Sequence, residues 1–339
     1  LRISFLVWDQ DIDAYSNLSS SDPMHEGLNT WPGFLTEFWI FLASRISQNS
    51  QEHESALDQI HSRLAAAVVE PSQTRSGPRA MIGNQLAFLF HAFEELVSST
   101  IFDVMSTVDA RAHDIWIGYL YHPRIDLRMI ARGLPDALIA FTPRLEDVET
   151  NLRGQLFSLA FAMADSGSTD LDPNEFLAGL LVAMPLSERG RALRSLARFM
   201  DQDSGAKADD TWRRWLRQLI AGLSGGAPIT VDAEQWSYVA ACVVALDQNF
   251  EDGVRLFTSH PASLSGDSLV LRQLKQSSHP ENHPVAVRDL LSHLLVNTRD
   301  PRSVTYSLGP IVRRLRRTLG PDALLEMVGR AVAASIPNA

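Results

Sequence analysis

Apolar side chains recur at every third or fourth position along most of this chain, with polar side chains between them. This spacing places the apolar residues on one face of an α-helix. A helix with one apolar face is stable only when that face is covered, so each predicted helix must pack against a neighbour. Such a face can lie against another helix of the chain or against another molecule. The four clearest stripes are Trp212, Trp215, Leu216, Leu219, Ile220 and Leu223; Val148, Leu152, Leu156, Leu159 and Met163; Phe34, Phe38, Phe41, Leu42 and Ile46; and Ile311, Val312, Leu315 and Leu319.

Residues that start and stop helices bound these stripes. The run Asp172-Pro173-Asn174-Glu175 offers an N-cap, a proline at the first helical position and a glutamate at the third, which is a capping-box arrangement. Gly222 and the pair Gly225-Gly226 close the helix that carries the two tryptophans. Helix start and stop signals of this kind predict roughly 14–16 helices joined by short connections. Only Leu1–Trp8 is open to being a strand.

Short connections between amphipathic helices favour antiparallel hairpins. The sequence therefore predicts an all-α fold, an irregular α-solenoid-like array of such hairpins without a fixed repeat period. Polar and glycine-containing stretches indicate loops at Ser16–Asn29, Glu70–Pro78 and Asp201–Asp210. The last predicts a boundary between two helical subdomains, residues 1–205 and 206–339.

The charge is unevenly distributed along the 339 residues. The net charge is −10, and residues 1–110 hold 14 acidic but only 5 basic side chains. An acidic surface repels phosphate backbones, which argues against a nucleic-acid partner. The single cysteine, Cys242, excludes an internal disulfide framework, and its apolar neighbours predict a buried thiol.

No signal peptide and no apolar run of about 20 residues is present, so we expect a cytoplasmic protein without a membrane partner. The chain begins at Leu1 and not at Met. We therefore expect it to be part of a longer protein.

Several short motifs resemble catalytic or metal-binding patterns but lack the required context. Gly222-Leu223-Ser224-Gly225-Gly226 fits a nucleophile elbow, yet a helix and not a strand leads into it, so a helix C-cap is favoured. Two acidic runs begin like calcium loops but lack the diagnostic glycine and glutamate, so turn and cap roles are favoured. These runs are Asp9, Asp11 and Asp13, and Asp170, Asp172 and Asn174.

Two clusters of ionisable residues have a spacing that could serve metal binding or acid–base chemistry. His279 and His283 have metal-ligand spacing, but two prolines interrupt the segment, so a loop with ordinary histidines is favoured. Glu54, Asp58 and His61 share a helix face, where a solvated surface is favoured over acid–base chemistry. No P-loop and no Rossmann fingerprint occurs, so the sequence predicts neither a cofactor nor an enzyme.

Two groups of arginines are candidates for contact with a partner molecule, because guanidinium groups bind carboxylates and phosphates in pairs of hydrogen bonds. Both groups have an alternative role at the polar faces and C-terminal turns of helices. Trp212 and Trp215 are predicted to lie in the core beneath the first group. The two groups are Arg213, Arg214 and Arg217, and Arg313, Arg314, Arg316 and Arg317.

A pattern of aromatic, proline and leucine residues between Thr211 and Asn297 resembles a bacterial helical domain of unknown function. The residues that carry the resemblance are Trp212-Arg213-Arg214-Trp215, Arg217, Gly226-Ala227-Pro228, Glu234-Gln235-Trp236, Asn249-Phe250, Val254, Leu256, Pro261, Leu264, Leu271, Leu274 and His283-Pro284. That family typically forms the C-terminal part of long proteins that begin with a sirtuin-like, NAD-hydrolysing domain and act in anti-phage defence.

The resemblance implies a non-catalytic sensing or scaffolding module. Its partner would be a protein: a phage-derived trigger, an upstream enzyme domain or a second copy. The family transfers no catalytic residue to this chain. Two other hypotheses remain: an architectural oligomerisation domain, and a helical enzyme whose site is assembled from scattered residues such as Glu54, Asp58, His61 and the arginines.

Overall fold

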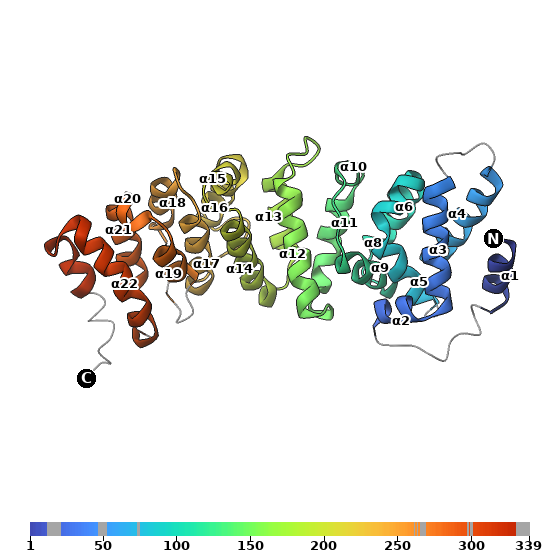
Figure 1. Ribbon diagram of the computed structural model, residues 1–339, viewed down its shortest axis with the longest axis horizontal. Coiled ribbons are helices and arrows are strands. Elements are labelled where there is room, and N and C mark those ends of the chain that lie inside the picture. Colours follow the sequence, from blue (N-terminus) through green and yellow to red (C-terminus); the bar gives the residue numbers. More distant parts are fainter. Residues whose placement is uncertain are drawn as a thin grey trace. The chain divides into compact units, whose positions relative to one another are not determined.

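All regular structure in the described part of the chain is helical. The computed structural model describes residues 1–11, 22–46, 53–72, 75–260, 262, 264, 269–296, 298 and 301–329. Within these residues no strand occurs, which confirms the predicted all-α fold (Figure 1). The solenoid-like stacking of hairpins stays a prediction. Among the described helices, none is both long enough and apolar enough to cross a membrane.

The chain divides into two compact units. Unit 1 comprises Leu1–Asp172 with Ala183–Pro185, and unit 2 comprises Pro173–Val182 with Leu186–Ala339. The helices of unit 1 are α1 (Arg2–Asp11), α2 (Pro23–Asn29), α3 (Trp31–Ile46), α4 (Glu54–Val69), α5 (Ser76–Asn84), α6 (Leu86–Ala92), α7 (Glu94–Leu96), η4 (Val97–Ile101), α8 (Phe102–Met105), α9 (Ala110–Tyr121), α10 (Leu127–Ala131), α11 (Leu134–Phe141), η5 (Thr142–Asp147) and α12 (Thr150–Asp165).

The following helices lie in unit 2, except that Ala183, the last residue of α13, belongs to unit 1. They are α13 (Pro173–Ala183), α14 (Leu186–Gln202), α15 (Ala206–Thr211), η6 (Trp212–Leu216), α16 (Arg217–Ser224), α17 (Ala233–Val244), α18 (Phe250–Phe257), α19 (Leu269–Gln276), α20 (His279–Asn282), α21 (Pro284–Leu295), α22 (Pro301–Leu319) and η7 (Asp322–Leu324).

The described residues form more helical segments than the 14–16 that the sequence predicts, in part because two long stretches are subdivided. The stretch 86–105 contains α6, α7, the π turn η4 and α8. The stretch 206–224 contains α15, the π turn η6 and α16. A π turn changes the hydrogen-bonding pattern locally without ending the helix.

The core of unit 1 is built on the close approach of α5 to α9. A Cβ atom added at Gly83 would lie 2.0 Å from the carbonyl oxygen of Ile115, and one added at Gly118 would lie 1.8 Å from that of Ala80. Only glycine leaves room for this packing. Beside the contact, the buried Arg79 guanidinium donates to the Asp114 carboxylate, with Nε–Oδ2 2.9 Å.

The first segment, Leu1–Trp8, is not a strand. Residues Arg2–Asp11 form α1, which buries Phe5 and Trp8 against Trp39 of α3, at ring-centroid distances of 5.3 and 4.8 Å. Residues three apart share a helix face, whereas residues three apart in a strand point to opposite faces. The spacing of the two aromatic residues was the signal for a helix.

Three of the four apolar stripes face the core. The stripes that begin at Trp212 and at Val148 are entirely buried, and in the fourth stripe Ile311 and Leu315 are buried. The third stripe does not face the core of unit 1, since Phe34, Phe38 and Phe41 are exposed. Their helix, α3, instead buries Pro32, Gly33, Thr36, Trp39, Ile40 and Ala43.

The segment Asp201–Asp210, which the sequence predicts to be a subdomain boundary, is packed into unit 2. The N–H of Gly205 donates to the carbonyl oxygen of Ala245 at 3.0 Å. Asp209 is buried, and its carboxylate accepts the N–H groups of residues 247, 248 and 249 at 3.2, 2.8 and 3.1 Å. These bonds join α15 to the turn after α17, so the chain divides near Asp172 and not at residue 205.

Candidate functional site

The arginines of α22 divide between one anchoring residue and three exposed ones. Arg314 donates to the Glu281 carboxylate of α20 and to the carbonyl oxygens of Leu274, Lys275 and Ser277, the last three at 3.3, 3.0 and 2.6 Å. The Arg314 guanidinium holds the pKa of Glu281 below its usual value. Arg313, Arg316 and Arg317 are exposed. Their helix is therefore held to the rest of unit 2 while these three cations face solvent.

The arginines that follow Trp212 are engaged in surface ion pairs. Arg214 Nε lies 2.9 Å from Asp210 Oδ2, and Arg217 Nε lies 2.8 Å from Asp252 Oδ2. The hydrogen bond from Arg217 lowers the pKa of Asp252, while the carboxylate raises the pKa of Arg217. Arg213 makes a longer pair with Asp210, at 3.6 Å. Carboxylates of the chain itself therefore partly neutralise this group, which is less available to a partner than the three exposed arginines of α22.

A third arginine row lies on α14 and escaped the sequence interpretation. Arg191, Arg194 and Arg198 are exposed opposite the buried Ala192, Leu193, Leu196 and Ala197. Arg191 pairs with Glu188 at 3.7 Å. The spacing of three and four residues between the arginines, opposite an apolar stripe, was the signal that could have identified the row.

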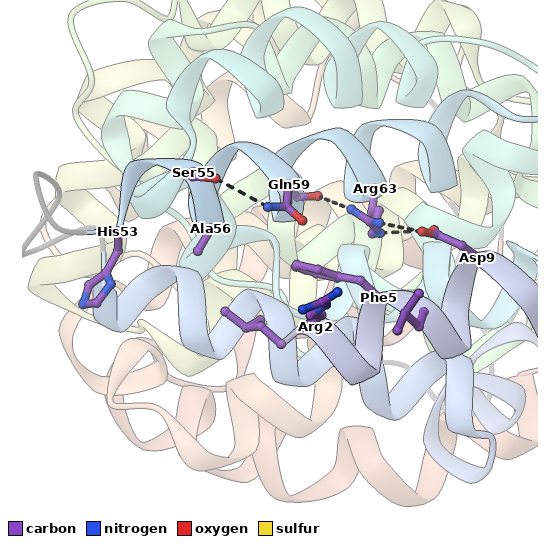
Figure 2. A pocket seen from close by; sticks show the side chains of 10 residues that line it. Arg2, Phe5, Asp9, His53, Ser55, Ala56, Gln59 and Arg63 are labelled. Carbon is purple, nitrogen blue, oxygen red and sulfur yellow. Dashed lines mark hydrogen bonds and ion pairs between the residues drawn. The ribbon is translucent and has the colours of Figure 1, made fainter.

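A groove of about 570 Å³ lies between α1 and α4 (Figure 2). Arg63 of α4 crosses it to the Asp9 carboxylate, with Nη2–Oδ2 2.6 Å, and its guanidinium carbon lies 4.2 Å from the ring centroid of Phe5. His53, Ser55 and Gln59 line the α4 side. Since Asp9 already pairs with Arg63, the groove does not present this carboxylate for acid–base work. Its geometry explains how α1 is attached to α4.

A second groove, of about 710 Å³, lies between α3 and α6. Its walls include Phe41 and Arg45 of α3 and Phe88 and His91 of α6. Both phenylalanine rings are half exposed, and an arginine lies over each: Arg45 at 5.2 Å from the Phe41 centroid and Arg124 at 5.0 Å from the Phe88 centroid. The sequence interpretation missed this groove because it assigned Phe41 to the covered face of its helix.

The residues 222–226 terminate α16, as the sequence predicts. Gly225 N–H donates to the carbonyl oxygens of Ala221 and Gly222, and Gly226 has a left-handed φ of +79°. Backbone in that region favours glycine, which is why the helix ends here. The resemblance of this run to a nucleophile elbow therefore reflects a C-cap.

The two histidines with metal-ligand spacing are committed to other contacts. His279 is buried, stacks on Phe250 with a centroid distance of 4.1 Å, and donates from Nε2 to the Val244 carbonyl oxygen at 2.9 Å. Burial lowers the pKa of His279. His283 Nδ1 lies 3.0 Å from Glu251. Among the described residues no group of three or more His, Cys, Asp or Glu side chains is placed to hold a metal ion.

The remaining acidic candidates lie on the surface or beyond the described residues. Asp13 lies outside the described part of the chain. The backbone N–H of Asp170 donates to Ser168 Oγ at 3.3 Å, as in a turn. Asn174 pairs with Gln218 at 3.3 Å. Glu54 and Asp58 are exposed on α4, while the His61 ring lies edge-on to Phe93 at 5.5 Å. A solvated helix face accounts for this trio.

Comparison with known families identifies one domain. Residues 171–328 match the family described as "Domain of unknown function (DUF4020)". The match starts beside the first residue of unit 2, Pro173, and includes the whole of Thr211–Asn297, on which the resemblance to a helical domain of unknown function rests. Searches of curated proteins and of solved structures gave no match. Nearly all the described residues of unit 2 are therefore similar to this domain of unknown function.

Proposed function

We propose that this chain is a non-catalytic sensing and scaffolding module of a larger bacterial, cytoplasmic, sirtuin-like anti-phage defence protein. Its partner is a protein, either a phage-derived trigger or an upstream NAD-hydrolysing domain that the module restrains. The resemblance of Thr211–Asn297 supports this context. The match of residues 171–328 to a domain of unknown function is compatible with it.

The observation that carries the proposal is the exposed arginine face of α22. Arg313, Arg316 and Arg317 point away from a helix that Arg314 anchors through bonds to α20 and to the end of α19. A guanidinium group on a fixed helix loses little additional backbone freedom on binding. It also presents paired donors that match a carboxylate. These properties suit recognition of an acidic patch on a folded protein.

The charge of the matched domain supports a face-specific interaction. Residues 171–328 hold 18 basic and 18 acidic side chains, so the domain has no net charge to attract acidic molecules at long range. Attraction must come from local clusters such as Arg313, Arg316 and Arg317. Such clusters act over about 8 Å at physiological ionic strength.

One experiment tests the non-catalytic role. Purified residues 1–339 are incubated with NAD⁺, and the nucleotide is followed by chromatography over hours. We expect NAD⁺ to remain intact. Turnover that survives repurification and disappears in His61→Ala would favour the dispersed-site enzyme instead. Reading the coding sequence upstream of the Leu1 codon completes the test, because the proposal requires an NAD-hydrolysing domain there.

A second experiment tests the arginine face. The upstream domain is produced separately, and its binding to residues 1–339 is measured by calorimetry at two salt concentrations. Triple reversal of Arg313, Arg316 and Arg317 to Glu should weaken binding at least tenfold. The matched control reverses Arg191, Arg194 and Arg198, which changes the net charge equally on α14. Equal weakening by both triples would contradict a specific α22 face.

A further inference from the structure

We propose that α3 is a self-association surface, on which the α3 of a second copy of this chain docks antiparallel. The surface consists of Phe34, Phe38, Phe41 and Arg45, and we call it the α3 face. The three rings are 53%, 46% and 58% exposed. Three neighbouring aromatic rings half open to water are unusual on a surface with no binding role.

The rotation of α3 about its axis is fixed, so the α3 face cannot turn inward. A Cβ atom added at Gly33 would lie 1.8 Å from the carbonyl oxygen of Gly27, which shows how closely α3 approaches α2. Trp39 and Ile40 are fully buried on the inner side. Burial of Phe34 and Phe38 would require this packing to break. The exposed rings are therefore a stable property of unit 1.

The spacing of the α3 face is the same in both chain directions. Steps of four, three and four residues separate Phe34, Phe38, Phe41 and Arg45. These steps keep the residues on one side of a helix and match the seam along which two helices pack. In an antiparallel pair with a two-fold axis midway between positions 38 and 41, Phe38 meets Phe41 of the second copy. Phe34 meets Arg45 of the second copy.

Both of these contacts are chemically favourable. Two phenylalanine rings attract each other in offset or edge-on geometry. A guanidinium over a ring makes a cation–π contact. Arg45 already lies 5.2 Å from the centroid of Phe41 within its own chain, so its side chain reaches aromatic surface at this end of the helix. The α3 face is thus complementary to itself.

Three other basic residues near the N-terminus form ion pairs with carboxylates, unlike Arg45. Among the five in residues 1–110, Arg63 pairs with Asp9, Arg75 with Glu70 and Arg79 with Asp114. Arg45 instead lies over an exposed ring. Its position beside the groove between α3 and α6 leaves space for a ring of the second copy.

The size of the surface sets the expected strength. Half-exposed rings of about 200 Å² each leave roughly 300 Å² of aromatic surface on the α3 face. A standard interface covers about 800 Å² per partner. The α3 face is therefore the centre of a contact to which Phe88, 43% exposed and lining the same groove as Phe41, adds apolar area. We expect a reversible dimer with a dissociation constant in the micromolar range.

The acidity of the first 110 residues opposes association of two copies at low salt. Added salt screens this repulsion and leaves the aromatic contact in place. Self-association should therefore strengthen between about 20 and 500 mM NaCl. Weakening with salt would contradict the proposed contact, because it would indicate an interface held by opposite charges.

The first test is sedimentation equilibrium of residues 1–339 from 1 to 200 µM. The wild type should pass from monomer to dimer, and Phe38→Ser and Phe41→Ser should each raise the dissociation constant at least tenfold. Val108→Ser is the control, since Val108 is 64% exposed in the same unit but lies outside α3. A wild type that is monomeric throughout this range would overturn the proposal. Circular dichroism checks that each variant keeps its fold.

The second test maps the register by disulfide formation. Differently tagged Phe34→Cys and Arg45→Cys chains are mixed and mildly oxidised. The antiparallel register brings these positions within disulfide reach, whereas two Phe34→Cys chains place their cysteines about 16 Å apart. Cross-linking of the mixed pair supports the proposal. Cross-linking of Phe34→Cys with itself, but not with Arg45→Cys, would show a parallel pair and overturn it. The native Cys242 is 1% exposed, and the unmodified chain serves as the control.

This self-association is independent of the proposed role of α22. Reversal of Arg313, Arg316 and Arg317 should leave the dimer unchanged, and Phe38→Ser should leave binding of the upstream domain unchanged in a monomeric sample.

Discussion

At the scale of single residues, buried or half-buried polar side chains join helices that the apolar stripes alone would leave loosely aligned. Asp209 binds the turn after α17, and Arg314 binds the end of α19 and α20. Neither role could be predicted from the sequence. Asp209 lies in a polar stretch that resembles a loop, and Arg314 stands among three arginines of identical type.

The Asp209 contact predicts a large loss of stability in Asp209→Ala. Three partly buried backbone N–H groups would lose their acceptor, which costs about 3 kcal/mol. Thermal unfolding measured by calorimetry should show a lower transition temperature for unit 2. Asp210→Ala is the control: Asp210 is half exposed, and its ion pairs with Arg213 and Arg214 lie at the surface, so a change below about 1 kcal/mol is expected. Equal effects at the two positions would contradict the assigned role of Asp209.

The bond between Arg314 and Glu281 predicts a dependence of stability on pH. The folded-state pKa of Glu281 lies below the ordinary value of 4.5. Its contribution to stability is therefore present above about pH 4.5 and is lost as the pH falls through the folded-state pKa. Chemical unfolding of wild type and Glu281→Gln should give different midpoints at pH 7, and the difference should shrink below pH 4.

Arg314→Ala extends this prediction to the helix itself. Loss of Arg314 removes bonds to three carbonyl oxygens as well, so α22 should be destabilised by about 1–2 kcal/mol. Arg316→Ala, two positions away and exposed, should change the free energy of unfolding by less than about 0.5 kcal/mol. Amide hydrogen exchange in α22 provides the measurement, and similar exchange rates in the two variants would contradict the anchoring role.

At the scale of helices, periodicity predicts which segments are helical better than it predicts which face is buried. The stripe that starts at Trp212 runs uninterrupted opposite Arg213, Arg214 and Gln218, so its inward face is unambiguous. In α3 apolar residues occur all round the helix, and two faces compete. The inner face was decided by Trp39 and by the close approach of Gly33 to Gly27, neither of which a count of hydrophobic positions reveals.

The glycine contact between α5 and α9 gives a prediction at this scale. In Gly118→Ala the new methyl group would lie 1.8 Å from the Ala80 carbonyl oxygen, so the two helices must separate. The expected cost is about 3 kcal/mol. Gly154→Ala in α12 is the matched control, because its methyl group meets no atom within 4 Å. It should stabilise the chain by about 0.5–1 kcal/mol, since alanine favours helix. Thermal unfolding distinguishes the two outcomes.

At the scale of the whole molecule, the two compact units divide near Asp172, whereas the sequence predicts a boundary between residues 205 and 206. The polar run 201–210 reads as a linker, yet most of it is helical and bonded into unit 2. The division near Asp172 falls at Pro173, the first residue of α13, so no loop-like composition marks it. Long-range contacts, such as Gln273 Nε2 to Asp201 Oδ1 at 2.8 Å, decide the boundary.

Fragments test where unit 2 begins. Residues 171–339 should fold, with helical circular dichroism and one cooperative thermal transition. Residues 206–339 lack α13 and α14 and expose the face of α17 that α14 covers, so this fragment should unfold non-cooperatively or aggregate. A cooperative transition in the shorter fragment, equal to that in the longer one, would contradict the division near Asp172.

The candidate surfaces were only partly predictable. The α22 arginines could be identified because like charges cluster on one helix, but the sequence did not reveal that Arg314 is the one that binds carbonyl oxygens at the end of α19 while the other three are exposed. The groove between α3 and α6 depends on the rotation of α3, which is set by contacts distant in sequence. Surface features formed by one helix can thus be predicted from the sequence, whereas features formed between helices cannot.

The π turn η6 at Trp212–Leu216 should allow the chain to tolerate the deletion of one residue at this point. An i→i+5 bond accommodates one residue more than an ordinary turn, so removal of Arg213 or Arg214 would allow α15 and α16 to join as a regular α-helix. The residues on either side would keep their orientation. A one-codon deletion, which elsewhere rotates everything downstream by about 100°, would here be absorbed within a single turn.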